Sequence, residues 1–187
     1  TLLNLCDRDG ETLERDVDIE DYLHRAEILS ALGKNVLISS FGEFYKLSQY
    51  LFAQTNRPVA IALGVPNLMN IFEERYYQNL EGGILEAFGK LFRNNIRLYV
   101  SPMLTADKHY LSLENIPVPE HLMHLFMHLK ENGYLYHLGS VEQSLLEIRS
   151  DDVLEKIRRG DPDWQNYVPP IVFDIISRQR LFQQSGS

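Results

Sequence analysis

The chain has 187 residues, of which 44% are hydrophobic and 24% charged, which is ordinary for one globular domain with a sizeable core. Its formal net charge of −8 argues against a nucleic-acid partner, because phosphate backbones are bound by basic surfaces. The single cysteine, Cys6, excludes an intrachain disulfide and fits a reducing compartment. No apolar run is long enough to cross a bilayer. Together with the negative net charge, this predicts neither a membrane nor a nucleic-acid partner.

The chain begins with a predicted β-hairpin. Leu3 and Leu5 alternate with polar neighbours, Asp9-Gly10 is typical of a tight turn, and apolar residues follow up to Ile19. The first residues have no signal-peptide pattern. The sequence starts without Met and runs directly into strand-like residues, so we expect a fragment of a longer protein. Residues 183–187 are expected to be a disordered or vector-derived tail.

A helix and three short apolar strands follow. Asp18 or Asp21 caps the helix, which runs to about Leu32 and ends at Gly33. Strands are predicted over residues 35–40, 59–63 and 96–100, with helices over 43–54, 67–77 and 80–93. Uniformly apolar strands separated by amphipathic helices indicate βαβ units, with a parallel sheet covered on both faces.

The last third of the chain is predicted to be mainly helical. A helix over residues 120–132 precedes a candidate fourth strand at 134–138. Residues 141–182 are then predicted to form helices, with breaks at Gly160-Asp161-Pro162 and at Pro169-Pro170.

The predicted fold class is α/β, a Rossmann-like three-layer sandwich with a mainly parallel sheet, an N-terminal β-hairpin and extra C-terminal helices. It forms one domain over residues 1–182. In such sheets ligands bind beyond the carboxyl ends of the strands. Those ends carry Ser39 and Ser40, which offer hydroxyl groups, and Gly64, which allows close backbone approach. The alternative is that these residues only form turns, which favour the same residue types.

Two charged residues fall on apolar helix faces. At about 100° per residue, Arg25 and Glu81 each lie within the apolar arc of their helix, near its start. Both helices are predicted to begin at the carboxyl edge of the sheet. We therefore expect Arg25 to bind a phosphate or carboxylate there, while Glu81 accepts from a hydroxyl or base and Gly82 exposes backbone N–H groups. The alternatives are a structural ion pair, or two side chains that turn to solvent.

Three histidines, His121, His124 and His128, lie on one strip of the helix over residues 120–132. They span two helical turns, too far for one ion about 2 Å from each nitrogen, so no metal site is predicted. A surface or packing role is favoured. The alternative is a metal held by two of them and an outside carboxylate.

The segment Leu5-Cys6-Asp7-Arg8-Asp9-Gly10 resembles the aspartyl nucleophile loop of haloacid-dehalogenase-like phosphatases. In that family two aspartates flanking one residue follow a strand. Ser39 matches the family's second motif and Asp151-Asp152 its last. However, Glu11 stands where the family usually has Thr or Val, and no lysine matches. The chain has no Walker loop, GxGxxG fingerprint or GxSxG elbow.

Several segments together resemble the carboxyl-terminal half of a family of larger bacterial cytosolic proteins, which carry the labels nicotinate-nucleotide adenylyltransferase and TonB-dependent receptor. These segments are residues 21–29, 35–39, 80–86, 160–164 and 168–170. The resemblance implies an α/β fold and a cytosolic location. It implies no catalytic residue, because the HxGH motif of adenylyltransferases is absent and His24 is followed by Arg25-Ala26-Glu27.

We therefore expect a cytoplasmic domain that binds a nucleotide or other phosphorylated metabolite, with a link to NAD metabolism. The expected ligand residues are Arg25, Ser39, Ser40, Gly64, Glu81 and Gly82. No catalytic residue and no cofactor is assigned. One alternative is a non-catalytic interaction or homodimerisation domain, with a surface formed by residues 41–45 and the C-terminal helices. The second is the phosphatase.

Overall fold

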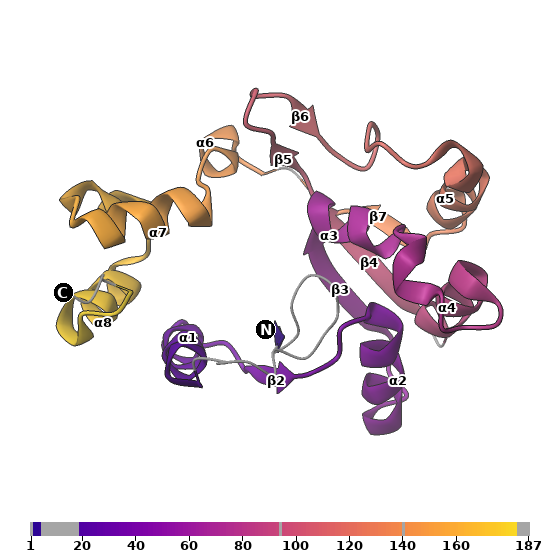
Figure 1. Ribbon diagram of the computed structural model, residues 1–187, viewed down its shortest axis with the longest axis horizontal. Helices are drawn as coiled ribbons and strands as arrows, with labels where there is room; N and C mark the ends of the chain where they lie inside the picture. Colours follow the sequence, from indigo (N-terminus) through magenta and orange to yellow (C-terminus); the bar gives the residue numbers. More distant parts are fainter. Residues whose placement is uncertain (1, 5–18, 94, 140, 183–187) are drawn as a thin grey trace. The chain divides into compact units, whose positions relative to one another are not determined.

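The computed structural model describes residues 2–4, 19–93, 95–139 and 141–182, which form a mixed α/β protein with two compact units (Figure 1). One, here named the sheet unit, contains the described residues from 41 to 146. The other, here named the terminal unit, contains those up to residue 40 and from 147 onward. That residues 1–182 form a single domain stays a prediction.

The sheet unit is built on the parallel strands β3 (Val59–Gly64), β4 (Ile96–Ser101) and β7 (Leu135–His137). Their order is β3-β4-β7, so β4 is central and is hydrogen-bonded on both sides. The strands predicted at 59–63, 96–100 and 134–138 are confirmed. Because the strands are parallel, their carboxyl ends meet at one edge of the sheet.

Helices and a short hairpin complete the sheet unit. The α-helices are α2 (Phe44–Gln54), α3 (Val65–Ile71), α4 (Gly83–Leu91), α5 (Met123–Glu131) and α6 (Gln143–Leu146). Two 3-10 helices, η1 (Glu74–Tyr77) and η2 (Glu120–Leu122), precede α4 and α5. An antiparallel pair, β5 (Met103–Leu104) and β6 (Tyr110–Leu111), follows β4.

The two faces of this sheet differ in their cover. On β4, Ile96, Leu98 and Val100 are fully buried in one core with side chains of α2, α3, α4 and α5. Successive side chains of a strand point to opposite faces, and on the other face Ala60 and Arg97 are exposed. Cover on both faces of the sheet therefore stays a prediction. The β4 sequence Ile-Arg-Leu-Tyr-Val alternates, as half-buried strands do.

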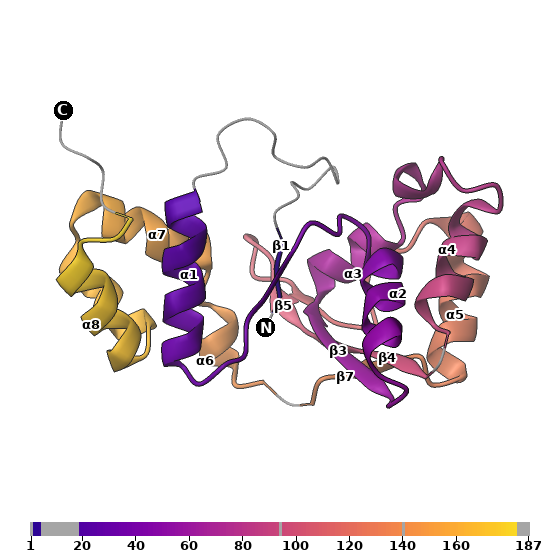
Figure 2. The same cartoon turned by 90° about the horizontal axis from the view of Figure 1, so that it is seen from below.

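The terminal unit pairs β1 (Leu2–Asn4) in parallel with β2 (Leu37–Ser39), and α1 (Ile19–Ala31) lies between them in sequence. Its remaining helices are α7 (Ser150–Arg159), η3 (Pro162–Tyr167) and α8 (Pro170–Gln179). Helices α1 and α8 lie side by side (Figure 2). The buried core comprises Val153, Ile157, Trp164, Val172, Ile176 and Leu181. Both predicted helix breaks are confirmed.

Of the predicted amino-terminal hairpin, the structure describes only β1 and Ile19. Strand β1 pairs in parallel with β2, and Ile19, expected in a second hairpin strand, begins α1. Glu20 and Asp21 follow Ile19, and the positive end of the helix dipole favours acidic residues in the first turn. The predicted turn at Asp9-Gly10 lies outside the described residues.

A truncation in the central strand tests this arrangement. Leu98 is fully buried, so Leu98→Ala removes packing and leaves a cavity. We expect the free energy of unfolding to fall by about 2–5 kcal/mol. Leu85 of α4 is 67% exposed, and Leu85→Ala is the matched control, with an expected change below about 0.5 kcal/mol. Urea unfolding followed by circular dichroism measures both. Equal losses at the two positions would contradict the buried place of β4.

Candidate functional site

The carboxyl edge of the sheet unit is formed by Gly64, Ser101 and His137, the last residues of β3, β4 and β7. The register pairs Gly64 with Ser101 and Val100 with His137, so these strand ends are neighbours. Parallel sheets bind ligands where their strands end. This edge is therefore the candidate site.

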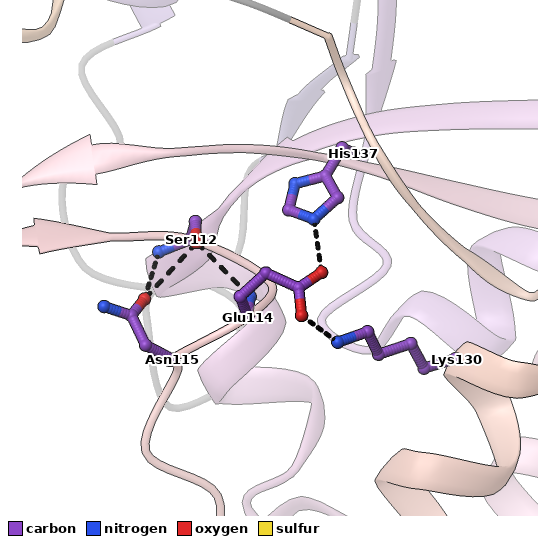
Figure 3. A network of polar contacts seen from close by, with 5 residues as sticks. All are labelled: Ser112, Glu114, Asn115, Lys130 and His137. Atoms are coloured by element: carbon purple, nitrogen blue, oxygen red, sulfur yellow. Dashed lines mark hydrogen bonds and ion pairs between the residues drawn. The ribbon is translucent and has the colours of Figure 1, made fainter.

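A polar network lies at the end of β7, where His137 and Lys130 both contact Glu114 (Figure 3). The Nε2 atom of His137 lies 2.8 Å from Oε1 of Glu114. The Nζ atom of Lys130 donates a hydrogen bond to Oε2 of the same carboxylate. Lys130 lies in the last turn of α5, whereas Glu114 lies between β6 and η2. Residues of two different elements therefore converge on one carboxylate.

A turn with its own hydrogen bonds holds the backbone of Glu114. The Oδ1 atom of Asn115 accepts from the N–H of Ser112 at 2.8 Å (Figure 3). The N–H of Glu114 donates to Oγ of Ser112 at 3.3 Å. Leu113 and Ile116 are buried and anchor the turn in the core. The backbone position of Glu114 thus depends on its neighbours and not on its own side chain.

The network favours the ionised form of Glu114. Hydrogen bonds from His137, and next from Lys130, lower the pKa of this carboxyl group below its ordinary value. The Glu114 side chain is 60% exposed, so water screens both ion pairs and they stabilise the fold little. Chemically, such a network can bind an oxyanion in place of the carboxylate, or orient an imidazole for proton transfer.

The sheet unit also has a cavity of about 290 Å³, close to the lower limit for small-molecule pockets. Its lining residues, mainly apolar, are Met69, Phe72, Glu73, Ile116, Pro117, Val118 and Pro119. Ile116 follows Glu114 by two residues in the chain, but no network residue lines the cavity. The cavity and the network are therefore separate features.

A second polar cluster lies in the terminal unit. The Nζ atom of Lys156 lies 3.2 Å from Oδ2 of Asp163 and 3.3 Å from Oδ2 of Asp161. Hydrogen bonds to Asp163 and then Asp161 raise the pKa of Lys156. A cavity of about 130 Å³, lined in part by Arg149 and Lys156, is well below the size of ligand pockets. The cluster is best explained as a structural contact that holds the connection between α7 and η3 in place.

Arg25, one of the predicted ligand residues, belongs to the terminal unit and is exposed. Its Nε donates to Oδ2 of Asp21 at 2.6 Å, and its guanidinium group lies 5.5 Å from the centre of the Phe182 ring. Arg25 is exposed although Ile28, three residues later in α1, and Phe182 both pack against the core of this unit. Its role as a ligand residue stays a prediction.

Ser39 and Ser40 lie at the end of β2, as predicted. Ser39 is only 8% exposed, and no described residue pairs with its hydroxyl group. Ser40 is exposed. A buried hydroxyl group without a partner costs free energy. At the end of β2, a polar ligand atom could therefore pair with the hydroxyl group of Ser39.

Gly64, Glu81 and Gly82 belong to the sheet unit, and Gly64 ends β3 as predicted. Helix α4 begins at Gly83, three residues later than predicted, so Glu81 lies outside the helix and is exposed. Its predicted place on an apolar helix face is wrong, because Gly83 with φ of 54° interrupts the helical path. The N–H of Gly82 donates to Oε2 of Glu86 at 2.9 Å, so this donor is engaged.

The predicted ligand residues thus fall in two groups, with three in each unit. That Arg25 and Glu81 lie together at the carboxyl edge of a sheet stays a prediction. Sequence reasoning missed Glu114, Lys130 and His137. The one signal for them was the predicted strand at 134–138, whose end carries His137.

The histidines of the predicted helix over 120–132 are all exposed, which fits a surface role. His121 Nε2 lies 2.7 Å from Oε2 of Glu74. In the described part of the chain, no group of three or more His, Cys, Asp or Glu residues could hold a metal ion. Of the phosphatase-like residues, Asp7 and Asp9 lie outside the described ranges, while Asp151-Asp152 is exposed in the first turn of α7.

The predicted interaction segment, residues 41–45, contributes to the core because Tyr45 is 5% exposed. The sheet face that carries Ala60 and Arg97 presents another set of side chains. There the rings of Tyr99 and Tyr136 stack at 5.3 Å, and the Arg97 guanidinium lies 5.7 Å from the centre of the Tyr136 ring. An interaction or dimerisation role stays a prediction.

Comparisons with known proteins found no relative of this chain. Neither a scan against protein-family models nor searches of curated proteins and solved structures found a match. Among the described residues, no helix combines the length and apolar composition that crossing a membrane requires.

The ionisation of Glu114 tests the network. A carbon-detected NMR titration should give this carboxyl group a pKa below the ordinary glutamate value, and Lys130→Met with His137→Gln should raise it. Because the folded-state pKa is the lower one, the stabilisation is present above the ordinary glutamate pKa. It is lost as pH falls through the lowered pKa. Lys156→Met, in the other unit, is the control. An unchanged Glu114 pKa in the double variant would rule the network out.

Proposed function

We propose that this chain is a cytoplasmic, Rossmann-like protein that binds a phosphorylated small molecule at the carboxyl edge of its three-stranded sheet. The supporting observation is that Lys130 and His137 converge on the carboxylate of Glu114 at the end of β7. Nitrogen donors that hold a carboxylate also fit the oxygens of a phosphate group. A nucleotide or related metabolite is the proposed ligand.

The neighbouring strand ends extend this proposed site. Gly64 has no side chain to hinder a ligand at the end of β3. The hydroxyl group of Ser101 donates to the Pro102 carbonyl at 3.3 Å, a long hydrogen bond that a phosphate oxygen could replace. A ligand lying across the edge would reach residues of all three strands. Arg25, Ser39, Ser40, Glu81 and Gly82 stay predicted ligand residues.

The choice of ligand follows from the resemblance to proteins labelled nicotinate-nucleotide adenylyltransferase. It adds nicotinate nucleotides, and hence NAD metabolism, to the proposed ligand class. Such a ligand combines a phosphate group with a planar ring. The phosphate would lie at Lys130 and His137. We assign no reaction, because we give no residue of this site the role of nucleophile or general base.

Thermal unfolding tests the proposed binding site. A bound nucleotide, nicotinate mononucleotide or sugar phosphate at about 100 times its Kd should stabilise the protein by about 2.7 kcal/mol, a rise in Tm of several degrees. Lys130→Met and His137→Gln should each abolish most of this shift. His124→Gln, at an exposed histidine of α5, is the matched control. A shift that persists in both site variants would place the ligand elsewhere, and no shift across the panel would contradict the proposal.

A phosphatase of the haloacid-dehalogenase-like class is the second candidate, and one observation favours it. Strand β1 pairs in parallel with β2, with α1 between them in sequence, so the aspartate segment follows a strand of a parallel pair in the chain. The pairing also sets Asn4 of β1 beside Ser39 of β2, so both strands run toward one edge. In that family the nucleophile loop follows one strand and the second motif ends its neighbour.

Phosphate release from p-nitrophenyl phosphate in magnesium-containing buffer tests this candidate. Asp7→Asn should reduce the release to background, because an amide cannot act as the carboxylate nucleophile. Asp18→Asn, outside the motif, should leave it unchanged. Equal release by the Asp7→Asn variant and the unmodified chain would exclude an aspartyl phosphatase.

A further inference from the structure

The two ion pairs of Glu114 contribute too little to folding stability to explain why the network exists. The Glu114 side chain is 60% exposed, and surface ion pairs contribute little to folding. Yet a lysine from α5 and a histidine from β7 both direct a nitrogen at this one carboxylate. The backbone of Glu114 is held independently, by Ser112 and Asn115. The two ion pairs are thus not needed to position the turn.

We propose that the space between Lys130 and His137 is a binding site for a phosphate group, and that the carboxylate of Glu114 occupies it in the free protein as an internal competitor. This inference rests on the proposed function, and adds how the site is regulated. A carboxylate presents two acceptor oxygens, whereas a phosphate group presents three and carries about −1.5 to −2 charges. A phosphorylated ligand therefore forms the stronger interactions with these donors.

Displacement of Glu114 requires no rearrangement of the fold. The hydrogen bonds of the turn involve the backbone of Glu114 and the side chains of its neighbours, and Leu113 and Ile116 stay anchored in the core. Because the Glu114 side chain is 60% exposed, its carboxylate can rotate into water about its own side-chain bonds. Because the carboxylate is already exposed to water, its release from the two nitrogens changes its solvation little.

The sign of one effect separates this role from the other role that the geometry allows. If Glu114 competes with the ligand, loss of its negative charge must tighten phosphate binding. If Glu114 instead orients His137 for binding or proton transfer, the same loss must weaken binding or leave it unchanged. Glu114→Gln keeps the shape of the side chain and removes the charge, so it tests this difference directly.

The experiment measures the Kd of inorganic phosphate by isothermal titration calorimetry on the full 187-residue chain. When a competitor fills a site for about nine-tenths of the time, its removal lowers the apparent Kd about tenfold. We expect a change of this order for Glu114→Gln. Glu155→Gln is the control, because Glu155 is also exposed, is paired with Arg159 and adds the same charge change. Its Kd should equal that of the unmodified chain.

The outcomes separate the inference from the proposed function. Tighter binding by Glu114→Gln that disappears on adding Lys130→Met supports both. If the unmodified chain binds phosphate through Lys130 and His137 but Glu114→Gln binds no tighter, the competitor role is overturned and the proposed site stands. If neither protein binds phosphate, the inference is overturned, and the thermal-shift panel decides the proposed function independently. Circular dichroism confirms that each variant is folded.

Discussion

Strand β4 is hydrogen-bonded on both sides, and its side chains Ile96, Leu98 and Val100 are fully buried. This central position constrains the rest of the sheet unit. The helices on either side of β4 in sequence, α4 and α5, bury Phe88 and Phe126 in the same core. Because β4 pairs with both neighbours in parallel, it also aligns the ends of β3 and β7 at one edge. The position of His137 thus follows from the packing of β4.

Hydrogen bonds within two short connections then position Glu114 and Lys130. The turn at residues 112–115 satisfies its own polar groups, and the α5–β7 connection ends α5 with Gly133 at φ of 71°. The N–H of Tyr134 donates to the Leu129 carbonyl at 2.9 Å, a hydrogen bond that closes the helix end. Two short connections, each stabilised within itself, therefore bring Glu114 and Lys130 to the end of β7. None of the network residues has to be buried for this arrangement.

The elements that sequence predicted well are those whose signals are local. Strand β3 is a short apolar segment bounded by turn residues, and α7 ends at Gly160 because glycine accepts φ of 68° there. The pairing of β1 with β2 joins residues more than thirty positions apart, as Leu2 with Leu37 shows, so no local pattern indicates it. The helical pattern of residues 80–93 predicts too early a start for α4, because the positive φ of Gly83 has no signal in the periodicity. The contact of Glu114 with His137 spans 23 residues and has no periodic signal.

The separation between the turn's backbone and the Glu114 side chain bears on how this protein can change over generations. Substitutions at Glu114 leave the hydrogen bonds of Ser112 and Asn115 and the packing of Leu113 in place. Changes at an exposed position of this kind usually alter stability little. Selection can therefore test different charges and sizes at the edge of the sheet while the core stays intact. The chemistry of this edge is free to diverge faster than the fold that carries it.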